Sequence, residues 1–356
     1  MNFELIDEAD FRKFADNSPY KSFYQTPEIA KLRQQNGWTP YYFGVKNGDK
    51  LIAAAMVVAR PTFLGKSTFY CPGGPLLEYE DASLVQFFFD RLKKYAKSHN
   101  GWLLHIEPYY ELIQRGRSGE VVDGGFSHEA AKRNLKAAGL LPCPTSDEPQ
   151  YAFVMDLAGR TGDQLLADMK RNTRNHVRKA EKKGVQVREL KREELDIFKR
   201  ITESTSHRRH FQDKPLEYYQ QMYDLFHERG EVMFLVAEAE SIPLSAAMFM
   251  TYGDEVIYLF SGSDEQYMKE YNAQYLIQWH MIKYAAEHGY KRYNFYGIQG
   301  LPDKSHKDYG IYDFKKGFDS TEHGHVTELI GAHEAPVSAT FYTLHRALSA
   351  LKSKLK

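Results

Sequence analysis

One pattern in the sequence occurs twice and decides the fold: GVKNGDKLIAAAMVV at Gly44–Val58 and LVAEAESIPLSAAMFM at Leu235–Met250. Each copy has the pattern of a strand, a turn with Gly or Pro, and a returning strand that contains Ala-Ala-Met. The motif Lys-Tyr-Ala-x-x-His follows each copy near the end of an expected helix, at Lys94–His99 and Lys283–His288. Because both matches recur in the same order, the sequence predicts two copies of one α/β unit. A duplicated unit predicts a cleft between the copies, which is a usual place for a large ligand.

The expected helices and strands alternate along the chain, which is typical of a mixed α/β (α+β) protein. Helices are expected where apolar residues recur every three or four positions, at 81–99, 129–138, 162–183, 216–228, 272–288 and 338–354. Strands are expected at 41–45, 51–59, 102–106, 151–157, 233–238, 245–252, 255–261 and 292–296. Three prolines within Pro142–Pro149 mark a boundary. The predicted domains are therefore residues 1–148 together with 330–356, whose helix packs back on the first domain, and residues 149–329.

Length and composition favour a two-domain globular protein. The 356 residues exceed the size at which a single core stops growing, and 42% of them are hydrophobic and 26% charged. The longest apolar run, Leu51–Ala59, is far shorter than the roughly 18 residues that a membrane-spanning helix needs. The N-terminus is acidic where a signal peptide would be basic and apolar, so we expect a cytoplasmic protein.

The common sequence motifs for cofactor binding, metal binding and a nucleophilic serine are absent or incomplete. Gly65–Thr68 (GKST) lacks the earlier glycine and the following helix of a phosphate-binding loop, and no GxGxxG, HExxH or GxSxG occurs. The two cysteines, Cys71 and Cys143, stand alone, so neither a disulfide framework nor a CxxC metal site is expected. The fourteen histidines show no ligand spacing. The sequence therefore predicts no metal and no tightly bound cofactor.

The strongest local anomaly is the basic stretch Lys170–Arg192, with ten basic residues against two acidic ones in a chain of zero formal net charge. Within its helical part, four of the basic residues fall on one face: Arg171, Arg174, Arg178 and Lys182. Such a stripe suits a phosphate backbone or a diphosphate. The alternative is a solvated helix face.

A second feature is aromatic and contains two lysines. The stretch Tyr293–Gly300 ends an expected strand in Gly-x-x-Gly, and the aromatic segment Tyr309–Phe318 follows a polar loop. It has two interpretations, a cation with aromatic walls at the end of a strand or an aromatic hairpin packed on a sheet edge.

Together these stretches resemble the Fem family (FemABX) of peptidoglycan-bridge aminoacyltransferases. DMKRNTRNHVRKAEKKGV at Asp168–Val185 is similar to that family's basic helix, and Tyr296–Gly297 with YDFKKGF at Tyr312–Phe318 is similar to its Gly…Phe-Lys-x-Gly-Phe segment. Weaker matches keep the family's order at 70–75, 106–108 and 135–156. The resemblance covers nearly the whole chain and is to the short members, which lack an inserted helical hairpin.

The resemblance implies two tandem N-acetyltransferase-like (GNAT-like) domains and a reaction. That reaction transfers an amino acid from aminoacyl-tRNA to the side-chain amine in the stem peptide of a peptidoglycan precursor, UDP-MurNAc-pentapeptide or lipid II, to form the interpeptide bridge. Aminoacyl-tRNA would be a co-substrate, with no other cofactor, and contact with a membrane would be peripheral. The coenzyme-A pyrophosphate loop of ordinary acetyltransferases, Arg/Gln-x-x-Gly-x-Gly/Ala, is missing from this sequence.

The resemblance also implies roles for single residues. Lys315, with Phe314 beside it, is expected at the acceptor end of the tRNA, where a fixed positive charge would hold phosphate and favour the oxyanion. Glu107 stands where the family has an aspartate and is the candidate base. The residues expected to bind the precursor are Lys31, Lys214, Tyr218, Tyr258 and Arg209, of which Lys214 replaces an arginine. The residues expected to bind tRNA are Arg171, Arg174, Arg178, Lys182 and Lys316.

Two other functions remain open from the sequence. One is a GNAT-like N-acyltransferase that uses another acyl donor or another amine acceptor, because a fold does not fix its substrate. The other is a non-enzymatic RNA-binding protein, which rests on the basic stripe alone and leaves the constellation at Tyr309–Phe318 without a role.

Overall fold

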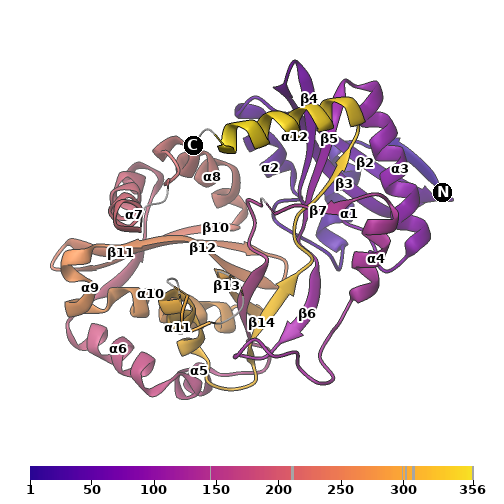
Figure 1. The fold of residues 1–356 in the computed structure, drawn as a ribbon. Helices are drawn as coiled ribbons and strands as arrows, with labels where there is room; N and C mark the ends of the chain where they lie inside the picture. Colours follow the sequence, from indigo (N-terminus) through magenta and orange to yellow (C-terminus); the bar gives the residue numbers. More distant parts are fainter. Residues whose placement is uncertain (145, 210–211, 299, 301–302, 307–308, 355–356) are drawn as a thin grey trace. The chain divides into compact units, whose positions relative to one another are not determined.

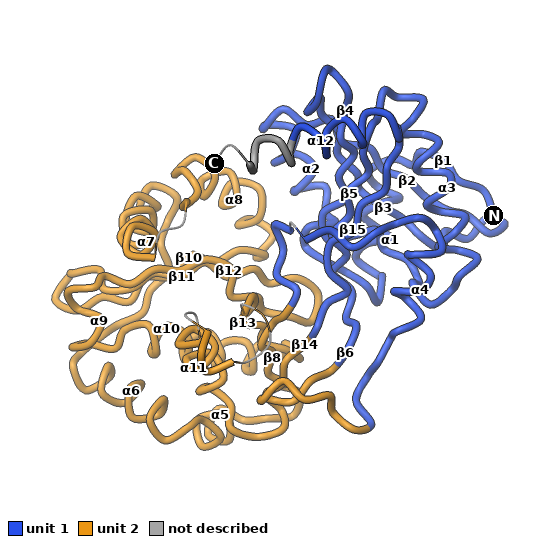
Figure 2. Tube along the Cα trace, in the orientation of Figure 1, with its two compact units in different colours: residues 1–113, 124–150, 328–356 blue, residues 114–123, 151–327 orange. Residues whose placement is uncertain are grey.

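The computed structural model describes residues 1–144, 146–209, 212–298, 300, 303–306 and 309–354. The chain forms two compact units (Figure 2): unit 1 comprises Met1–Ile113, Gly124–Gln150 and Glu328–Lys356, and unit 2 comprises Gln114–Asp123 and Tyr151–Thr327. Each unit has its own hydrophobic core. No helix among the described residues combines the length and the apolar character that crossing a membrane requires.

The segment Gln114–Asp123, which the sequence placed in the first domain, belongs to unit 2. Hydrogen bonds of Arg117 explain the difference. Its guanidinium donates to the carbonyl oxygens of Lys316 and Ser320, at 2.9 Å each, and its own carbonyl accepts from the hydroxyl of Tyr312.

Unit 1 is built on a mixed sheet (Figure 1). Its described strands follow the order β1-β2-β3-β4-β5-β15-β7. Their bounds are β1 (Asn2–Leu5), β2 (Thr39–Asn47), β3 (Lys50–Phe63), β4 (Lys66–Gly73), β5 (Gly101–Pro108), β7 (Leu141–Pro142) and β15 (His333–Pro336). The helices are α1 (Glu8–Asn17), α2 (Pro27–Gln35), α3 (Ala82–Ser98), α4 (Glu129–Ala137) and α12 (Ala339–Lys354). Neighbours from β1 to β4 are antiparallel, whereas β4 and β5 are parallel and α3 joins them.

Unit 2 repeats this plan. The described strands follow the order β6-β14-β8-β13-β12-β11-β10-β9, and the boundary between the units runs through β6 (Glu111–Arg115) and β14 (Gly324–Leu329). The other strands are β8 (Tyr151–Asp156), β9 (Gln186–Glu189), β10 (Val232–Ala239), β11 (Ile242–Tyr252), β12 (Glu255–Ser263) and β13 (Arg292–Ile298). The helices are α5 (Gly162–Asp168), α6 (Arg171–Lys182), α7 (Leu195–Arg209), α8 (Leu216–Phe226), α9 (Glu265–Tyr271), α10 (Ala273–Glu287) and α11 (Tyr309–Lys315).

The duplication predicted from the sequence is present in the topology. The series β2-β3-β4-α3-β5 matches β10-β11-β12-α10-β13, with two antiparallel pairs and then a parallel pair in each. Even the helix ends match. The ring of His99 stacks on Tyr95 at 3.9 Å and its Nδ1 lies 2.9 Å from the Tyr95 carbonyl oxygen, while His288 and Tyr284 give 3.8 and 2.8 Å.

Helices cover both faces of the sheet in unit 2 (Figure 1). Apolar side chains of α5, α6 and α10 join one face in a single core, which includes Leu165, Val177 and Met281. On the other face, Phe198 of α7 and Tyr219 of α8 contact Phe234 of β10. The sequence did not predict α7, because Thr202 and Ser206 occupy buried positions on its inner face and interrupt the apolar periodicity.

Two expected elements differ in the structure. The helix expected at 162–183 is broken into α5 and α6, because Met169 and Lys170 are extended and Met169 is buried in the core. The aromatic segment Tyr309–Phe318 is not a hairpin but the helix α11 followed by a 3-10 turn, Lys316–Phe318.

Candidate functional site

Lys315 is a buried lysine of unit 2. It ends α11 and is only 7% exposed, and its Nζ donates to the carbonyl oxygen of Gly297 at 2.5 Å. Burial lowers the pKa of Lys315 to about 7. The sequence assigned a fixed positive charge to this residue. With a pKa of about 7, the charge of Lys315 is sensitive to pH and to nearby anions, and its role stays a prediction.

Gly297, whose carbonyl oxygen accepts from Lys315, lies near the end of β13, where the backbone is strained. Among the described residues, β13 pairs with the parallel strand β12 only as far as Ile257 and Asn294. Tyr296 then adopts φ +59°, a left-handed conformation that is costly for a tyrosine, and its N–H donates to Oδ1 of Asn294 at 2.7 Å. Strain of this kind concentrates at functional sites, so the end of β13 is a candidate for one.

The two residues that flank Lys315, Phe314 and Lys316, both contact aromatic rings. Phe314 is half-buried, with ring centroids 5.0 Å from Tyr275 and 5.3 Å from Phe318. The Nζ of Lys316 donates to the hydroxyl of Tyr309 at 2.7 Å and lies 4.7 Å from the ring centroid of Tyr312. The tRNA-binding role of Lys316 stays a prediction, and these contacts already hold its side chain.

The structure brings the two sequence motifs of unit 2 together. The N–H of Lys170, just before α6, donates to the carbonyl oxygen of Gly317 at 2.9 Å, and its Nζ donates to Oδ1 of Asp313 at 3.0 Å. Gly317 permits this approach, because a Cβ at that position would lie 2.4 Å from Oγ1 of Thr173. The basic helix therefore begins beside the turn that follows Lys315.

The basic stripe is narrower than the sequence suggested. On α6, three of the four expected residues are exposed: Arg171, Arg178 and Lys182. Arg174 is half-buried, and its guanidinium donates to the carbonyl oxygens of Leu166 and Ala167 in α5. Further along the stretch, Lys183, Arg188 and Arg192 form ion pairs with Glu270, Glu238 and Asp224, respectively. Of the predicted stripe, the residues exposed to a polyanion are therefore Arg171, Arg178 and Lys182.

The residues of unit 2 that were expected to bind the precursor lie on different faces of its sheet. Tyr258 packs against Phe249 in the core beneath α10, and its hydroxyl donates to Oγ of Ser261. Burial raises the pKa of Tyr258 to about 12. Tyr218 of α8 instead contacts Phe260, on the face that α7 and α8 cover.

Two further predicted residues lie on the α7 and α8 side. Lys214 is exposed, with its Nζ 5.6 Å from the ring centroid of Tyr218, and Arg209 is exposed at the end of α7. Their roles stay predictions, and Tyr258 does not share their face of the sheet.

Glu107 lies in unit 1, on β5, and is 3% exposed. Its carboxylate accepts from the hydroxyl of Tyr70 at 2.7 Å and from the N–H of Asp147 at 2.9 Å, and Nε2 of His105 lies 3.0 Å away. Burial alone would raise the pKa of Glu107, but these hydrogen bonds together hold it below its ordinary value. A carboxylate stabilised in this way is a weak base, which argues against the role predicted for it.

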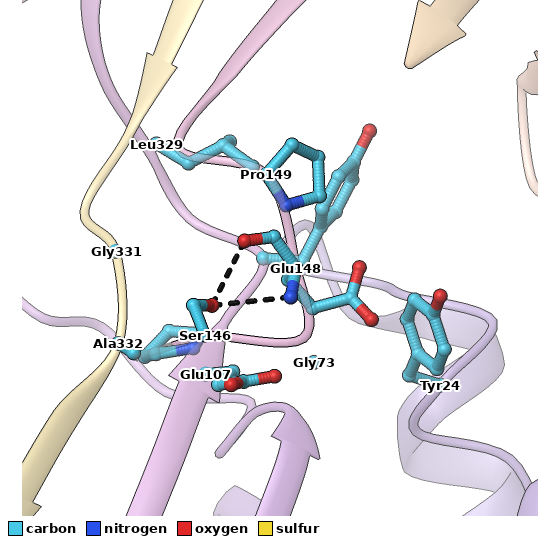
Figure 3. Close-up of a pocket in the computed structure, with 11 residues that line it drawn as sticks. Tyr24, Gly73, Glu107, Ser146, Glu148, Pro149, Leu329, Gly331 and Ala332 are labelled. Atoms are coloured by element: carbon cyan, nitrogen blue, oxygen red, sulfur yellow. Dashed lines mark hydrogen bonds between the residues drawn. The ribbon is translucent and has the colours of Figure 1, made fainter. Parts of the chain in front are cut away.

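A small cavity of unit 1 pairs Glu107 with a second carboxyl group, Glu148 (Figure 3). Its volume of about 10 Å³ is close to that of a single water position. Burial, together with the charges of Glu107 and Asp147, raises the pKa of Glu148 to about 8, although a hydrogen bond with Tyr24 opposes the shift. The pKa values of the two carboxyl groups are therefore shifted in opposite directions, an arrangement typical of acid–base pairs.

The sequence did not identify Glu148, because it stands in the proline-rich stretch that marks the domain boundary.

The sequence named Lys31 of α2 as a binding residue but did not name its neighbour Arg33. Lys31 is 49% exposed and pairs with Glu8 at 3.5 Å. Two residues on, Arg33 lies 5.3 Å from the ring centroid of Tyr70, and its charge acts on Glu148.

Comparisons with known proteins agree with this fold. The family model described as "FemAB family" matches residues 6–241 and 234–350. Aminoacyltransferase FemA of Staphylococcus aureus strain NCTC 8325 is 27% identical over 432 aligned residues, which cover all of both chains, and so is that of strain Mu50. The alignment is longer than this chain, so FemA contains segments that this chain lacks.

Solved structures show the same architecture. The crystal structure of FemX superposes with a TM-score of 0.82 and 21% identity, covering 97% of this chain and 99% of that chain. A tandem GNAT protein from the clavulanic acid biosynthesis pathway gives a TM-score of 0.53 with 12% identity and covers 95% and 98%. The two units are therefore tandem GNAT-like domains. Since the family model spans nearly the whole sequence, the chain belongs to the FemAB family and is an aminoacyltransferase.

Proposed function

We propose that this protein transfers an amino acid from aminoacyl-tRNA to the side-chain amine in the stem peptide of a peptidoglycan precursor, either UDP-MurNAc-pentapeptide or lipid II. The product would form the bridge between stem peptides. Family membership supports the reaction type, and one observation supports the donor. This observation is the placement of Lys315 beside the start of the basic helix α6.

The chemistry requires little beyond positioning and charge. An aminoacyl ester is already activated, so the enzyme must orient the amine, help it lose a proton and stabilise the oxyanion. Lys315 suits the last task, because a nearby anion raises the pKa of a buried lysine and so restores its charge when it is needed. The proposed transfer uses aminoacyl-tRNA as co-substrate and no redox cofactor.

The exposed face of α6 would hold the tRNA backbone, through Arg171, Arg178 and Lys182. In unit 2, the residues proposed to bind the precursor are Lys214, Tyr218 and Arg209, on the side of the sheet that α7 and α8 cover. Because aminoacyl-tRNA and the nucleotide-linked precursor are cytoplasmic compounds, the proposed reaction takes place there, with peripheral membrane contact if the acceptor is lipid II.

Mass spectrometry tests the proposal directly. The purified protein is mixed with a pool of charged tRNAs and with each acceptor in turn, and the product masses are measured. A gain of one or more amino-acid residues is the expected result, and it identifies both donor and acceptor. If neither acceptor gains mass with any charged tRNA, the proposal is wrong, and an N-acyltransferase with another donor or acceptor becomes the better explanation.

The variant Lys315→Met tests the proposed role of the lysine. Loss of a single charge that stabilises an oxyanion costs about 10²–10³ in turnover. We expect that loss, together with unchanged precursor binding and a folded protein by circular dichroism. Lys283→Met, which changes an exposed lysine of α10 that has no assigned role, is the matched control and should retain most of the turnover. Equal losses in the two variants would contradict the role assigned to Lys315.

A further inference from the structure

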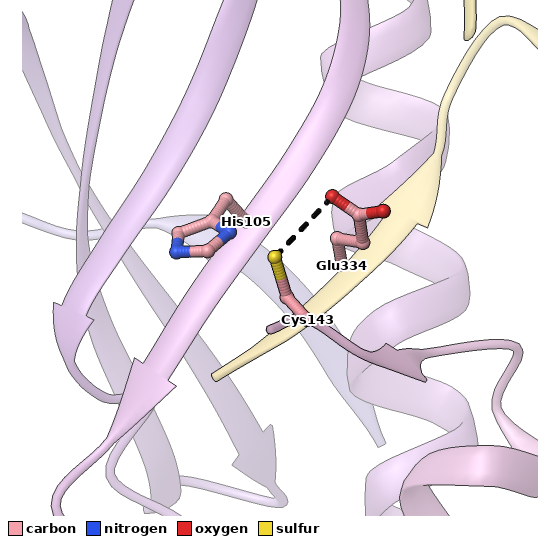
Figure 4. A group of neighbouring side chains, drawn as sticks. All are labelled: His105, Cys143 and Glu334. Atoms are coloured by element: carbon pink, nitrogen blue, oxygen red, sulfur yellow. Dashed lines mark hydrogen bonds between the residues drawn. The ribbon is translucent and has the colours of Figure 1, made fainter. Parts of the chain in front are cut away.

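Three metal-ligand side chains of unit 1 meet at the edge of its sheet (Figure 4). His105 is on β5, Glu334 faces it across the β5–β15 pair, and Cys143 directly follows β7. One potential ligand atom from each lies within 4.8 Å of the others, and all three residues are half-buried. The sequence could not show this cluster, because its members come from three segments that only the fold brings together.

We propose that His105, Cys143 and Glu334 bind one divalent metal ion of the zinc class, with the fourth coordination position open to water or a ligand. A thiolate, an imidazole and a carboxylate are the donors that Zn²⁺ prefers, and sites with three protein ligands keep an open position. Bonds of about 2.0–2.3 Å in tetrahedral geometry set the ligand atoms about 3.3–3.8 Å apart. The 3.7 Å between Sγ of Cys143 and Oε2 of Glu334 already fits.

The surroundings of the cluster orient two of its ligands. Nε2 of His105 is hydrogen-bonded to Glu107, so Nδ1 is the ring nitrogen left for a metal. Histidines that bind metals usually have such a carboxylate on the other ring nitrogen, which fixes the tautomer. The hydroxyl of Tyr342 donates to Oε1 of Glu334 at 2.5 Å, leaving Oε2 beside Cys143.

A bound ion would fasten the chain between β7 and β8. The N–H of Cys143 donates to the carbonyl oxygen of Ala332, and the N–H of Asp147 donates to Glu107. The same stretch contributes Ser146 and Glu148 to the cavity beside Glu107. The metal would therefore fix the position of the stretch that carries Ser146 and Glu148. Through His105, it would also fix the position of the Glu107 carboxylate. This inference does not depend on the proposed function.

Cobalt spectroscopy of the untagged, chelator-treated full chain tests the site, since Co²⁺ occupies zinc sites and a thiolate bound to it gives a near-ultraviolet charge-transfer band. We expect one Co²⁺ per chain, the thiolate band, and displacement of Co²⁺ by Zn²⁺. Because the chain has only two cysteines, two variants assign the band. Cys143→Ser should abolish it, whereas Cys71→Ala, which alters the buried cysteine, should leave it unchanged.

Two further variants keep the test sharp. Glu334→Gln removes a ligand charge without changing size and should weaken metal binding. Glu107→Gln changes the hydrogen-bond partner of His105, together with the acceptor for Tyr70 and Asp147, and should weaken metal binding by about 10–100-fold. Circular dichroism of each variant checks its fold. A band that survives in Cys143→Ser, or the absence of saturable Co²⁺ and Zn²⁺ binding to the folded wild-type chain, would overturn the proposal.

Discussion

At the scale of single residues, Lys315 owes its properties to what surrounds its ammonium group. In the described part of the chain, its hydrogen-bond partner is a backbone carbonyl oxygen and not a carboxylate. Burial therefore dominates, and the pKa falls to about 7. A lysine in this state is neutral in mildly alkaline solution and recovers its charge when an anion binds beside it.

This low pKa makes the stability of the fold depend on pH. Between about pH 7 and 10 the unfolded lysine is protonated while the folded one is neutral, so the unfolded state binds more protons. The free energy of unfolding of the wild type, measured relative to Lys315→Met, should therefore rise with pH by up to about 1.4 kcal/mol per unit. Urea unfolding of both proteins at pH 7, 8 and 9 measures the difference. A constant difference would show that Lys315 keeps an ordinary pKa.

A functional residue can be recognised in the sequence when its neighbours along the chain form a motif, and not when its partners are brought together only by the fold. Lys315 was predicted because a short motif surrounds it, but its lowered pKa comes from burial that no motif encodes. Glu148 had no motif, and its raised pKa depends on Glu107, which is distant in sequence. The assembly of His105, Cys143 and Glu334 needs three paired segments. Chemistry made by tertiary packing is therefore the part that sequence reasoning missed.

At the scale of elements, Arg174 and Arg178 of α6 differ: the first is hydrogen-bonded to α5 and the second is exposed to solvent. Arg174 donates to carbonyl oxygens at the C-terminal end of α5, which have no partners within that helix. Arg178, one turn later, is exposed. The sequence predicted one uniform stripe because periodicity shows only which face a residue shares, and not what lies above that face.

The variants Arg174→Met and Arg178→Met compare how much each arginine contributes to the stability of the fold. Loss of the hydrogen bonds from a charged guanidinium should lower the free energy of unfolding by about 1.5–3 kcal/mol in Arg174→Met. The exposed Arg178→Met should change it by less than about 0.5 kcal/mol. Chemical denaturation followed by circular dichroism measures both. Similar values for the two variants would show that Arg174 does not stabilise α5.

Elements with regular apolar patterns were predicted well. The paired strands β2–β3 and β10–β11 and the helices α3 and α10 lie where the sequence placed them. Failures have local causes: Thr202 and Ser206 replace apolar residues in α7, and Met169 turns into the core where a continuous helix was expected. The aromatic residues of α11 favour strands by propensity, but here they pack from a helix.

At the scale of the whole molecule, charge distribution matters more than total charge. The 47 basic and 47 acidic residues cancel, so net charge contributes no attraction to a polyanion. The stretch 170–192 alone has a large excess of basic residues, and the remainder of the chain must balance it. Proposed tRNA binding should therefore depend on the exposed basic face of α6 and not on exposed lysines such as those of α3.

Two double variants with the same change in net charge test this dependence. Arg178→Glu with Lys182→Glu reverses two charges on the exposed face of α6, and Lys94→Glu with Lys97→Glu reverses two exposed charges on α3. Binding of tRNA is measured from about 50 to 200 mM salt, where each lost phosphate contact reduces the slope of log affinity against log salt by about one unit.

We expect the α6 variant to bind more weakly and to lose about two units of slope, while the α3 variant keeps the wild-type slope. Equal losses in both would mean that overall charge, and not a local contact, governs binding. No change in either would mean that the face of α6 is merely solvated. Because the two variants differ only in where the charge is removed, the comparison isolates position from total charge.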